Sequence, residues 1–343
     1  MTAPARAPWG AVAVVGPHII DVLGRPVSEI PAGQGSARLE EIRLTVAGTG
    51  GGAAVDLAKL GCRVSSFAAI GDDVLGQLLT SQLRAHGVDV DGLVVRRDQV
   101  TSATILPIRP NGERPALHVP GATPTLVAAD LDTGALLAAD AVLLGGPETT
   151  PRLWEPDGIA IVEAVHAAGT PIFVDLLHPA TPDTTAMLAP LLPMVDWFMP
   201  NDQQLRGLTG CDDLVDAAGA LLARGVGGVA VTVGEHGALL VRPATGPVTV
   251  PAFPTTVVDT TGCGDSFNAG MITGVLAGCA VEDAALIGCA CGALVATGLG
   301  SDAGIDDLSG VLALIDTHHP DVADRIHRTL DQHTARAGVA LES

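Results

Sequence analysis

An aspartate at the start of a predicted helix is the residue of this sequence with the clearest chemical potential. The segment VVDTTGCGDSF, residues 257–267, passes through two glycines and reaches Asp265 where helical apolar spacing begins. The free N–H groups of Gly262, Cys263, Gly264 and Asp265 would form an anion site there, strengthened by the helix dipole. A carboxylate could simply cap the helix, as Ser, Thr or Asn would, but it opposes anion binding unless it has another task. We therefore interpret Asp265 as a base that takes a proton from a hydroxyl group beside a phosphoryl group.

A glycine-rich segment, GTGGGA at residues 48–53, lies between a strand-like run and a helical pattern. It fits the G-x-G-x-x-A spacing of dinucleotide-binding loops. The first apolar strand, however, ends at Gly16 and carries no such loop, so we do not expect NAD binding. The glycines instead indicate a tight turn or the close approach of a ligand to the backbone. Asp56, one helical turn further on, could point toward the same ligand.

Asp21 follows the first apolar strand in the segment GPHIID. An aspartate at this position could close a surface turn. Alternatively, it could lie at the carboxyl end of a parallel strand, where ligands of such sheets bind, and accept hydrogen bonds from two sugar hydroxyls.

The composition excludes several ways of binding phosphate. The net charge is −20 and no basic segment could neutralise a nucleic-acid backbone, so we expect no nucleic-acid partner. The single lysine, Lys59, stands in Ala-Lys-Leu and fits neither a P-loop nor the strand lysine of protein kinases. Any phosphate must therefore be held by backbone amides, arginines and metal ions.

Cysteine spacing and hydropathy indicate a cytoplasmic protein. The six cysteines form no C-x-x-C pair and no zinc-type spacing with histidine, as expected for reduced thiols in a core. The apolar run AVAVVG near the N-terminus is too short for a signal peptide. The apolar stretches on either side of Glu282 and Asp283 fall short of the roughly 18–20 residues that a membrane span needs. We therefore expect buried helices there and no membrane association.

The candidate residues are carried by alternating strand-like and helix-like segments. Continuous apolar strands with amphipathic helices between them predict a mostly parallel sheet with helices on both faces. The expected strands are residues 11–16, 64–71, 140–146, 171–177, 196–201 and 228–234. Two β-rich sections without helices, about 22–47 and 93–119, predict a small sheet that projects as a lid. No linker-like segment divides the chain, so we expect a single domain over residues 1–343.

With these motifs, the chain resembles the ribokinase-like family of sugar and nucleoside kinases, also called the PfkB family. DTTGCGDSFNAG is similar to the family segment D-T-x-G-A-G-D, and GGAAVDLAKLG is similar to its glycine pair and following helix. Further matching segments, in the family order, are AAIGDDVLGQLLTSQLRAHGVDVDGL, NGERPALHVPGAT, MPNDQQLRGLTG and VTVGEHGALL. The resemblance covers about residues 11–315. It implies an α/β ribokinase-like three-layer fold with a small β-sheet lid, and transfer of the γ-phosphoryl group of ATP to a hydroxyl.

The resemblance also implies a role for individual residues. Asp265 would be the base, and Gly262, Cys263 and Gly264 would form the anion hole, with Mg²⁺ supplying further positive potential. The positions that match substrate-binding residues are Asp21, Gly51, Gly52 and Asp56. The positions that match the nucleotide side are Asn201, Thr232, Gly234, Gly237 and Asn268. A loop that binds a monovalent cation such as K⁺ in some members is matched by Asp259, Thr261 and the backbone of Gly298 and Gly300.

Three residues depart from the family pattern. Asp56 stands where the family has asparagine, which removes a hydrogen-bond donor and adds charge. Gln204 replaces the glutamate of the N-x-x-E motif, which helps to organise the water shell of Mg²⁺, so metal affinity or rate could differ. Cys263 replaces alanine. A thiol at a helix N-terminus could have a lowered pKa and be sensitive to oxidation, but ordinary packing is the simpler interpretation.

Three functions fit these residues. The favoured one is a kinase for a small sugar, and the second is a nucleoside kinase of the same fold. Bases usually stack on aromatic side chains, and the chain has no tyrosine, three tryptophans and five phenylalanines, none of which lies in residues 93–119. The third is a weakly active ligand-binding relative, suggested by Gln204.

Two further expectations concern charge and assembly. A phosphorylated acceptor would need a cluster of arginines, for which the candidates are Arg43, Arg96, Arg97, Arg109 and Arg114. Exposed arginines of a lid are, however, commonly just solvated. The lid strands could also pair across a two-fold axis, as in some relatives, so we expect a homodimer.

Overall fold

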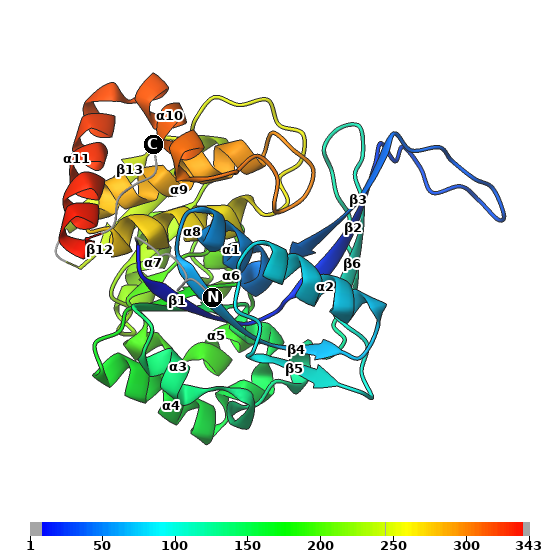
Figure 1. The fold of residues 1–343 in the computed structure, drawn as a ribbon, viewed down its shortest axis with the longest axis horizontal. Helices are drawn as coiled ribbons and strands as arrows, with labels where there is room; N and C mark the ends of the chain where they lie inside the picture. Colours follow the sequence, from blue (N-terminus) through cyan, green and yellow to red (C-terminus); the bar gives the residue numbers. More distant parts are fainter. Residues whose placement is uncertain (1–8, 244, 339–343) are drawn as a thin grey trace.

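The computed structural model describes residues 9–243 and 245–338. Residues 1–8, 244 and 339–343 belong to the expected domain range but lie outside the described residues. Figure 1 shows a main body of sheet and helices from which a small sheet projects to one side. The predicted alternation of strands and helices is present along most of the body, whereas the first predicted strand is followed by β2 (Ile19–Arg25) and β3 (Glu41–Ala47) and the last by β12 (Ala238–Arg242) and β13 (Thr245–Val250).

A nine-stranded sheet forms the centre of the body. Its spatial order is β13-β12-β11-β10-β9-β8-β1-β4-β5, in which the pairs from β11 through β5 are parallel and β12 and β13 are antiparallel additions at one edge. The strands are β1 (Ala11–Val15), β4 (Arg63–Gly71), β5 (Leu93–Arg96), β8 (Ala141–Gly145), β9 (Ile172–Asp175), β10 (Trp197–Phe198), β11 (Val229–Thr232), β12 (Ala238–Arg242) and β13 (Thr245–Val250). The carboxyl ends of the parallel strands therefore meet along one edge, as the sequence predicted.

Helices cover both faces of this sheet. Along β1, Val12 and Val14 pack into one apolar core while Ala13 and Val15 pack into the other, because successive strand side chains point to opposite faces. The first core is covered by α1 (Gly48–Lys59), α2 (Val74–Ala85), α8 (Cys263–Leu276), α9 (Val281–Val295), α10 (Leu308–His318) and α11 (Pro320–Ala337). The second is covered by α3 (Thr133–Leu137), α4 (Pro156–Ala167), α5 (Pro182–Leu188), α6 (Asp202–Thr209) and α7 (Leu214–Leu222).

The lid is a four-stranded sheet of order β3-β2-β6-β7. Its strands are β2 (Ile19–Arg25), β3 (Glu41–Ala47), β6 (Ala103–Pro107) and β7 (Leu117–Val119). The predicted turn at Pro110-Asn111-Gly112 connects β6 and β7, and the Gly112 amide donates to the Arg109 carbonyl at 2.9 Å. The expected lid is therefore present, but β5 does not belong to it. Although Leu93–Arg96 lies within the predicted lid section, it pairs with β4 at the edge of the large sheet, because helix α2 returns the chain parallel to β4.

The two apolar stretches near the C-terminus are helices α8 and α9, which pack against each other in the first core. Within the described residues, no helix is both long and apolar enough to cross a membrane.

Candidate active site

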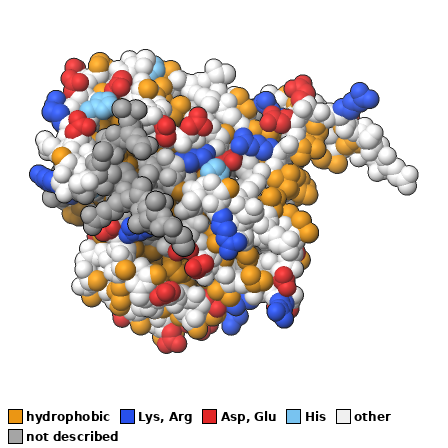
Figure 2. All heavy atoms as spheres, viewed as in Figure 1, with side chains coloured by type: hydrophobic (Ala, Val, Ile, Leu, Met, Phe, Trp, Pro, Cys, Tyr) orange, Lys and Arg blue, Asp and Glu red, His pale blue; other side chains and the backbone are white. Residues whose placement is uncertain are grey.

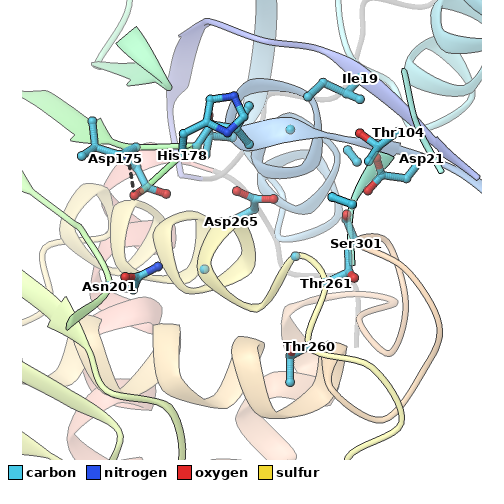
Figure 3. Close-up of a pocket in the computed structure, with 18 of the residues that line it drawn as sticks. Ile19, Asp21, Thr104, Asp175, His178, Asn201, Thr260, Thr261, Asp265 and Ser301 are labelled. Atoms are coloured by element: carbon cyan, nitrogen blue, oxygen red, sulfur yellow. Dashed lines mark hydrogen bonds between the residues drawn. The ribbon is translucent and has the colours of Figure 1, made fainter. Parts of the chain in front are cut away.

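A cavity of about 280 Å³ lies where the lid meets the carboxyl ends of the parallel strands. The lid supplies Asp21, Thr104 and His118 to its wall, and the start of helix α8 supplies Gly264 and Asp265. Figure 3 shows Asp265 between two groups of side chains, with Asp21 and Thr104 on one side and Asp175 and His178 on the other. Segments that the sequence analysis assigned to separate motifs therefore lie next to one another in the structure.

Asp265 lies in the first turn of α8, whose N-cap is Gly262 with a positive φ of 83°. A Cβ atom on Gly262 would lie 2.4 Å from the Cα atom of Ser301, so both the backbone angle and the space require glycine. Burial, together with the nearby carboxylate of Asp21, raises the pKa of Asp265 to about 7, although Arg114 opposes the rise. A carboxyl group with this pKa can accept a proton near neutral pH, as a general base must.

Not all of the residues expected to form the anion hole line the cavity. Gly262 and Gly264 line the cavity, and residues at a helix start have N–H groups without a partner four residues earlier. Cys263 does not line the cavity, and its N–H points to the carbonyl oxygen of Thr260 at 3.4 Å. Burial raises the pKa of the Cys263 thiol to about 12, so the alternative of a reactive low-pKa thiol is wrong and the thiol is a packing group.

Asp21 lies inside lid strand β2 and not in the loop after β1 where the sequence placed it. Its register partner on β6 is Thr104, whose hydroxyl lies 3.0 Å from Nδ1 of His118. Burial raises the pKa of Asp21 to about 6, while the hydrogen bond from Thr104 and the charge of Arg114 lower it. The lid therefore brings a carboxylate to the acceptor side of the cavity, where it can accept hydrogen bonds from hydroxyl groups.

The glycine cluster lines the cavity only in part: Gly48 and Thr49 belong to the wall, whereas Gly51 and Gly52, the expected substrate-binding glycines, do not. Gly51 packs against Val46, from which a Cβ would be 2.8 Å away, and Gly52 packs against the Asp265 carboxylate. Asp56 is fully buried at the interior face of α1, and neither of its carboxylate oxygens has a hydrogen-bond partner among the described residues. Burial raises its pKa well above the ordinary value. Asp56 does not line the cavity, although it lies close enough to Asp265 for that charge to contribute to the rise, and its contact with a substrate stays a prediction.

Two of the expected nucleotide-side residues line the cavity. Asn201 and Thr232 lie next to each other through a parallel bridge and both face the cavity. Gly234 and Gly237 do not line it; they form the turn after β11, in which the Gly237 amide donates to the Gly234 carbonyl at 3.1 Å. Asn268 is buried in α8, and its Nδ2 donates to Oδ2 of Asp175 at 2.6 Å.

Asp175 was missed by the sequence analysis. It ends strand β9, lines the cavity and is almost completely buried. Burial and the nearby Asp265 raise its pKa well above the ordinary value. The sequence could have indicated this residue, because an aspartate directly after the apolar run PIFV is expected at the carboxyl end of a parallel strand, where ligands bind. His118 and His178 were also missed; their ring centroids are 5.8 Å apart and both line the cavity.

Gln204 uses both ends of its amide inside the protein. Its Oε1 accepts from the backbone N–H of Asn201 at 2.9 Å, while its Nε2 donates to the backbone carbonyl of Leu176 at 2.9 Å. Oδ1 of Asn201 in turn accepts from the backbone N–H of Gln204 at 2.8 Å, which completes a capping box at the start of α6. Gln204 therefore connects α6 to the end of β9, and its Oε1 keeps a second lone pair that can accept a hydrogen bond from water.

The loop before α8 is organised by Asp259. Its Oδ1 accepts from the amide and hydroxyl of Thr261 at 3.0 and 2.8 Å, and its Oδ2 accepts from the Gly300 amide at 3.1 Å. Gly298 lies in the same turn, with its amide donating to the Val295 carbonyl at 3.2 Å. The expected cation-loop residues are thus close together, although the described chain contains no cluster of three or more His, Cys, Asp or Glu side chains around one point.

The five arginines considered for a phosphorylated acceptor do not converge. Arg43 bonds to the Leu299 carbonyl at 2.8 Å, Arg96 pairs with Asp130, and Arg109 lies 3.6 Å from Glu113. Of the lysines and arginines that the structure describes, only Arg114 lines the cavity.

Comparison with known proteins identifies the family and the fold. Residues 11–308 match the pfkB family carbohydrate kinases. An ATP-dependent ribose-1-phosphate kinase from Halopiger xanaduensis is 30% identical over 271 residues, which cover 79% of this chain and 86% of that protein. The structure of Arabidopsis thaliana ribokinase with ribose and ATP superposes with a TM-score of 0.77 at 24% identity and covers 89% of this chain and 98% of that one. An E. coli protein solved with ATP and Mg²⁺ has the same TM-score at 22% identity, over 90% of this chain and 99% of its own.

The chain therefore belongs to the pfkB family of carbohydrate kinases. The ribokinase-like fold expected from the motifs is confirmed. The expected enzyme class, an ATP-dependent carbohydrate kinase, is likewise confirmed by the family.

Proposed function

We propose that this kinase phosphorylates a hydroxyl group of a small, uncharged sugar, with Asp265 as the base. The observation that carries the proposal is the position of Asp265 between the helix N-terminus of α8 and the lid carboxylate Asp21, with its pKa raised to about 7. One side of the base can hold a phosphoryl group and the other can hold hydroxyls.

In the proposed step, the acceptor oxygen forms a bond to the γ-phosphorus of ATP while the bond from that phosphorus to the bridging oxygen breaks. The bridging electron pair stays on ADP, and the acceptor proton moves to the Asp265 carboxylate. The amides at Gly262 and Gly264 would stabilise the charge on the equatorial phosphoryl oxygens, because fixed donors need no reorganisation during the reaction. Asp21 would orient the acceptor by accepting hydrogen bonds from its other hydroxyls.

ATP and Mg²⁺ fit the end of the cavity formed by Asp175, Asn201 and Thr232. Asp175 offers a carboxylate there, and the neighbouring Asn268 has a buried Oδ1 without a partner among the described residues. Hard oxygen donors of this kind suit Mg²⁺, which would neutralise charge on the phosphates when bound. Asp175 would hold the metal through its water shell, because it offers a carboxylate where Gln204 offers only a neutral amide oxygen that already accepts one hydrogen bond.

The loop around Asp259 is the proposed site of a monovalent cation such as K⁺. Asp259 already fixes Thr261 and Gly300, so the carboxylate ties the start of α8 to the loop after α9. A cation bound there would add positive charge behind the anion hole.

A sugar fits the cavity better than a nucleoside. Within the described chain, neither phenylalanine nor tryptophan lines the cavity, so a base would lack the usual stacking surface. The nucleoside alternative is supported only by the imidazole rings of His118 and His178.

We further propose a homodimer formed through the lid. Side chains alternate across lid strands, so Thr104 faces the cavity while its neighbour Ile105 faces outward. Figure 2 shows hydrophobic side chains gathered on the projecting lid. The outward face that is exposed consists of Ile42, Leu44, Ile105, Leu117 and Val119. An exposed apolar face with residues from three of the four lid strands is typical of a contact surface, and a second copy of the lid would present the matching face.

The function is tested by measuring ADP release with pentoses, hexoses, ketoses, sugar acids and nucleosides. Turnover on a neutral sugar with loss of activity in Asp265→Asn supports the proposal. Preferred turnover of nucleosides would favour the second candidate. Tight ATP binding without turnover on any acceptor would favour a ligand-binding relative.

A further inference from the structure

Arg114 lies in the hairpin between β6 and β7 and reaches from the lid to the loop that begins α8. Its Nε donates to Oγ1 of Thr260 at 3.2 Å, and its Nη2 donates to the Thr260 carbonyl at 3.4 Å. Its Nε also lies 3.9 Å from Oδ1 of Asp259. Thr260, an uncharged residue, thus holds the guanidinium in place beside the proposed anion hole.

No hydrogen bond to the described chain uses Nη1 of Arg114, while the side chain lines the cavity together with Asp21, Gly264 and Asp265. Its side chain is 38% exposed, compared with 0% for Asp259. The guanidinium therefore keeps donor capacity that faces the cavity after its contacts with the loop are made.

Because the cavity wall is rich in carboxylates, the positive charge of Arg114 has a clear electrostatic role there. Asp21, Asp175 and Asp265 all face the same small volume, into which a phosphoryl group with several negative charges must move. The positive charge of Arg114 lowers the pKa of both Asp21 and Asp265, so it acts on the acceptor side and on the base at once. Backbone amides would act on the α8 side of the transferred group, and on the opposite side Arg114 is the only lysine or arginine of the described chain that lines the cavity.

We propose that Arg114 is a catalytic residue, delivered by the lid, that donates to the transferring phosphoryl group and stabilises its charge in the transition state. This inference rests on the proposed kinase function but not on the identity of the sugar. Thr260 is the positioning residue that orients the guanidinium. An arginine suits this task because its planar fork can bond the Thr260 oxygens and the phosphoryl oxygens at the same time.

The kinetic experiment compares Arg114→Ala and Arg114→Lys with the wild type on the best acceptor from the screen. We expect Arg114→Ala to lower kcat by about 100-fold or more with the Kd of ATP unchanged, since a transition-state donor is lost. Arg114→Lys and added guanidinium ion at sub-denaturing concentration should each restore part of kcat. Thr260→Val keeps the charge but loses the hydroxyl, so its kcat should fall to an intermediate value.

Two arginines of the lid serve as controls. Arg109→Ala changes an exposed arginine of the same hairpin and should leave kcat unchanged. Arg43→Ala removes another contact between lid and body, formed with the Leu299 carbonyl and Asp302, without changing the charge of the cavity wall. A loss in Arg43→Ala as large as in Arg114→Ala, or absence of guanidinium rescue, would show that Arg114 merely braces the lid and would overturn the proposal.

A binding measurement separates this inference from the identity of the acceptor. ADP with aluminium fluoride mimics a phosphoryl group in transfer, so the wild type should bind it with Mg²⁺ more tightly than ADP alone, as measured by calorimetry. Arg114→Ala should bind ADP normally and lose this gain. If the gain persists, and Arg114→Ala instead raises KM only for anionic acceptors, Arg114 reads the acceptor and the proposal is wrong. Absence of turnover in the wild type would count against the proposed function, whereas the aluminium fluoride result would still test Arg114.

Discussion

A Cβ atom placed on Gly52 would lie 2.8 Å from Oδ2 of Asp265, so the carboxylate of the proposed base occupies the space where a side chain of α1 would be. Gly52 is in the interior of α1 with no positive φ, so glycine is not required there by the backbone. The contact with Asp265 is the reason for the glycine. Helix α1 therefore sets the position of the base from the side opposite the cavity.

Gly52→Ala is expected to separate activity from stability. The methyl group would displace the Asp265 carboxylate, and small displacements of reacting groups cost up to about 100-fold in rate. Alanine in a helix is favoured over glycine by roughly 0.5–1 kcal/mol, which partly offsets the strain. Urea unfolding should therefore show little loss while kcat falls by about 10–100-fold. Gly219→Ala in α7, where nothing lies within 4 Å of the new methyl, is the control and should leave kcat unchanged. Normal kcat in Gly52→Ala would contradict the role given to this contact.

The pH dependence of kcat/KM should report Asp265. Because its pKa is raised to about 7, the base is protonated at low pH, and kcat/KM should rise with pH through about 7 and then level off. The same shift affects folding. The folded-state pKa lies above the ordinary value of 3.8, so the unfolded state ionises first and stability decreases as pH rises from about 4 through about 7. Asp265→Asn should abolish activity and remove that part of the pH dependence of unfolding. A rate that is flat between pH 5 and 8 would exclude Asp265 as a base with this pKa.

Gln204→Glu should destabilise the protein although it restores the family residue. Glutamate has no donor for the Leu176 carbonyl and would place a buried charge near Asp175. Leaving a buried carbonyl unpaired costs about 1–3 kcal/mol, so the free energy of unfolding should fall by at least that amount near neutral pH. Gln203→Glu, one residue earlier and exposed, is the control and should be neutral. Equal stability of the two variants would show that the Gln204 clasp is dispensable.

The lid face should control assembly. Leu117 is 61% exposed on the outward face of β7, and a glutamate there would place charge in the proposed dimer contact. Sedimentation velocity should show a dimer for the wild type and a monomer for Leu117→Glu. Val74→Glu, at an equally apolar and 77% exposed site on α2, should leave the dimer intact. A wild type that sediments as a monomer at all concentrations would exclude the lid dimer.

The sequence alone determined the fold class and predicted the base. Alternating apolar periodicities predicted the parallel sheet and its helices, since each strand must be buried on both faces. The segment around Asp265 predicted an anion site at a helix start because all of its parts are local: two glycines, free amides and one carboxylate within a few residues. A local motif can be predicted from sequence because the backbone geometry of a turn or a helix start depends on only a few neighbouring residues.

Only the tertiary structure decided which distant side chains share the cavity. Asp56 has the right type one turn after the glycines, but α1 packs against α8 and buries this residue completely, so it does not line the cavity. Leu93–Arg96 has the pattern of a lid strand, yet its pairing with β4 is set by the path of α2. Asp175 and Arg114 become neighbours of Asp265 only when β9 and the lid hairpin converge on the start of α8. Their roles depend on packing and charge in a shared volume, which no single segment of the chain contains.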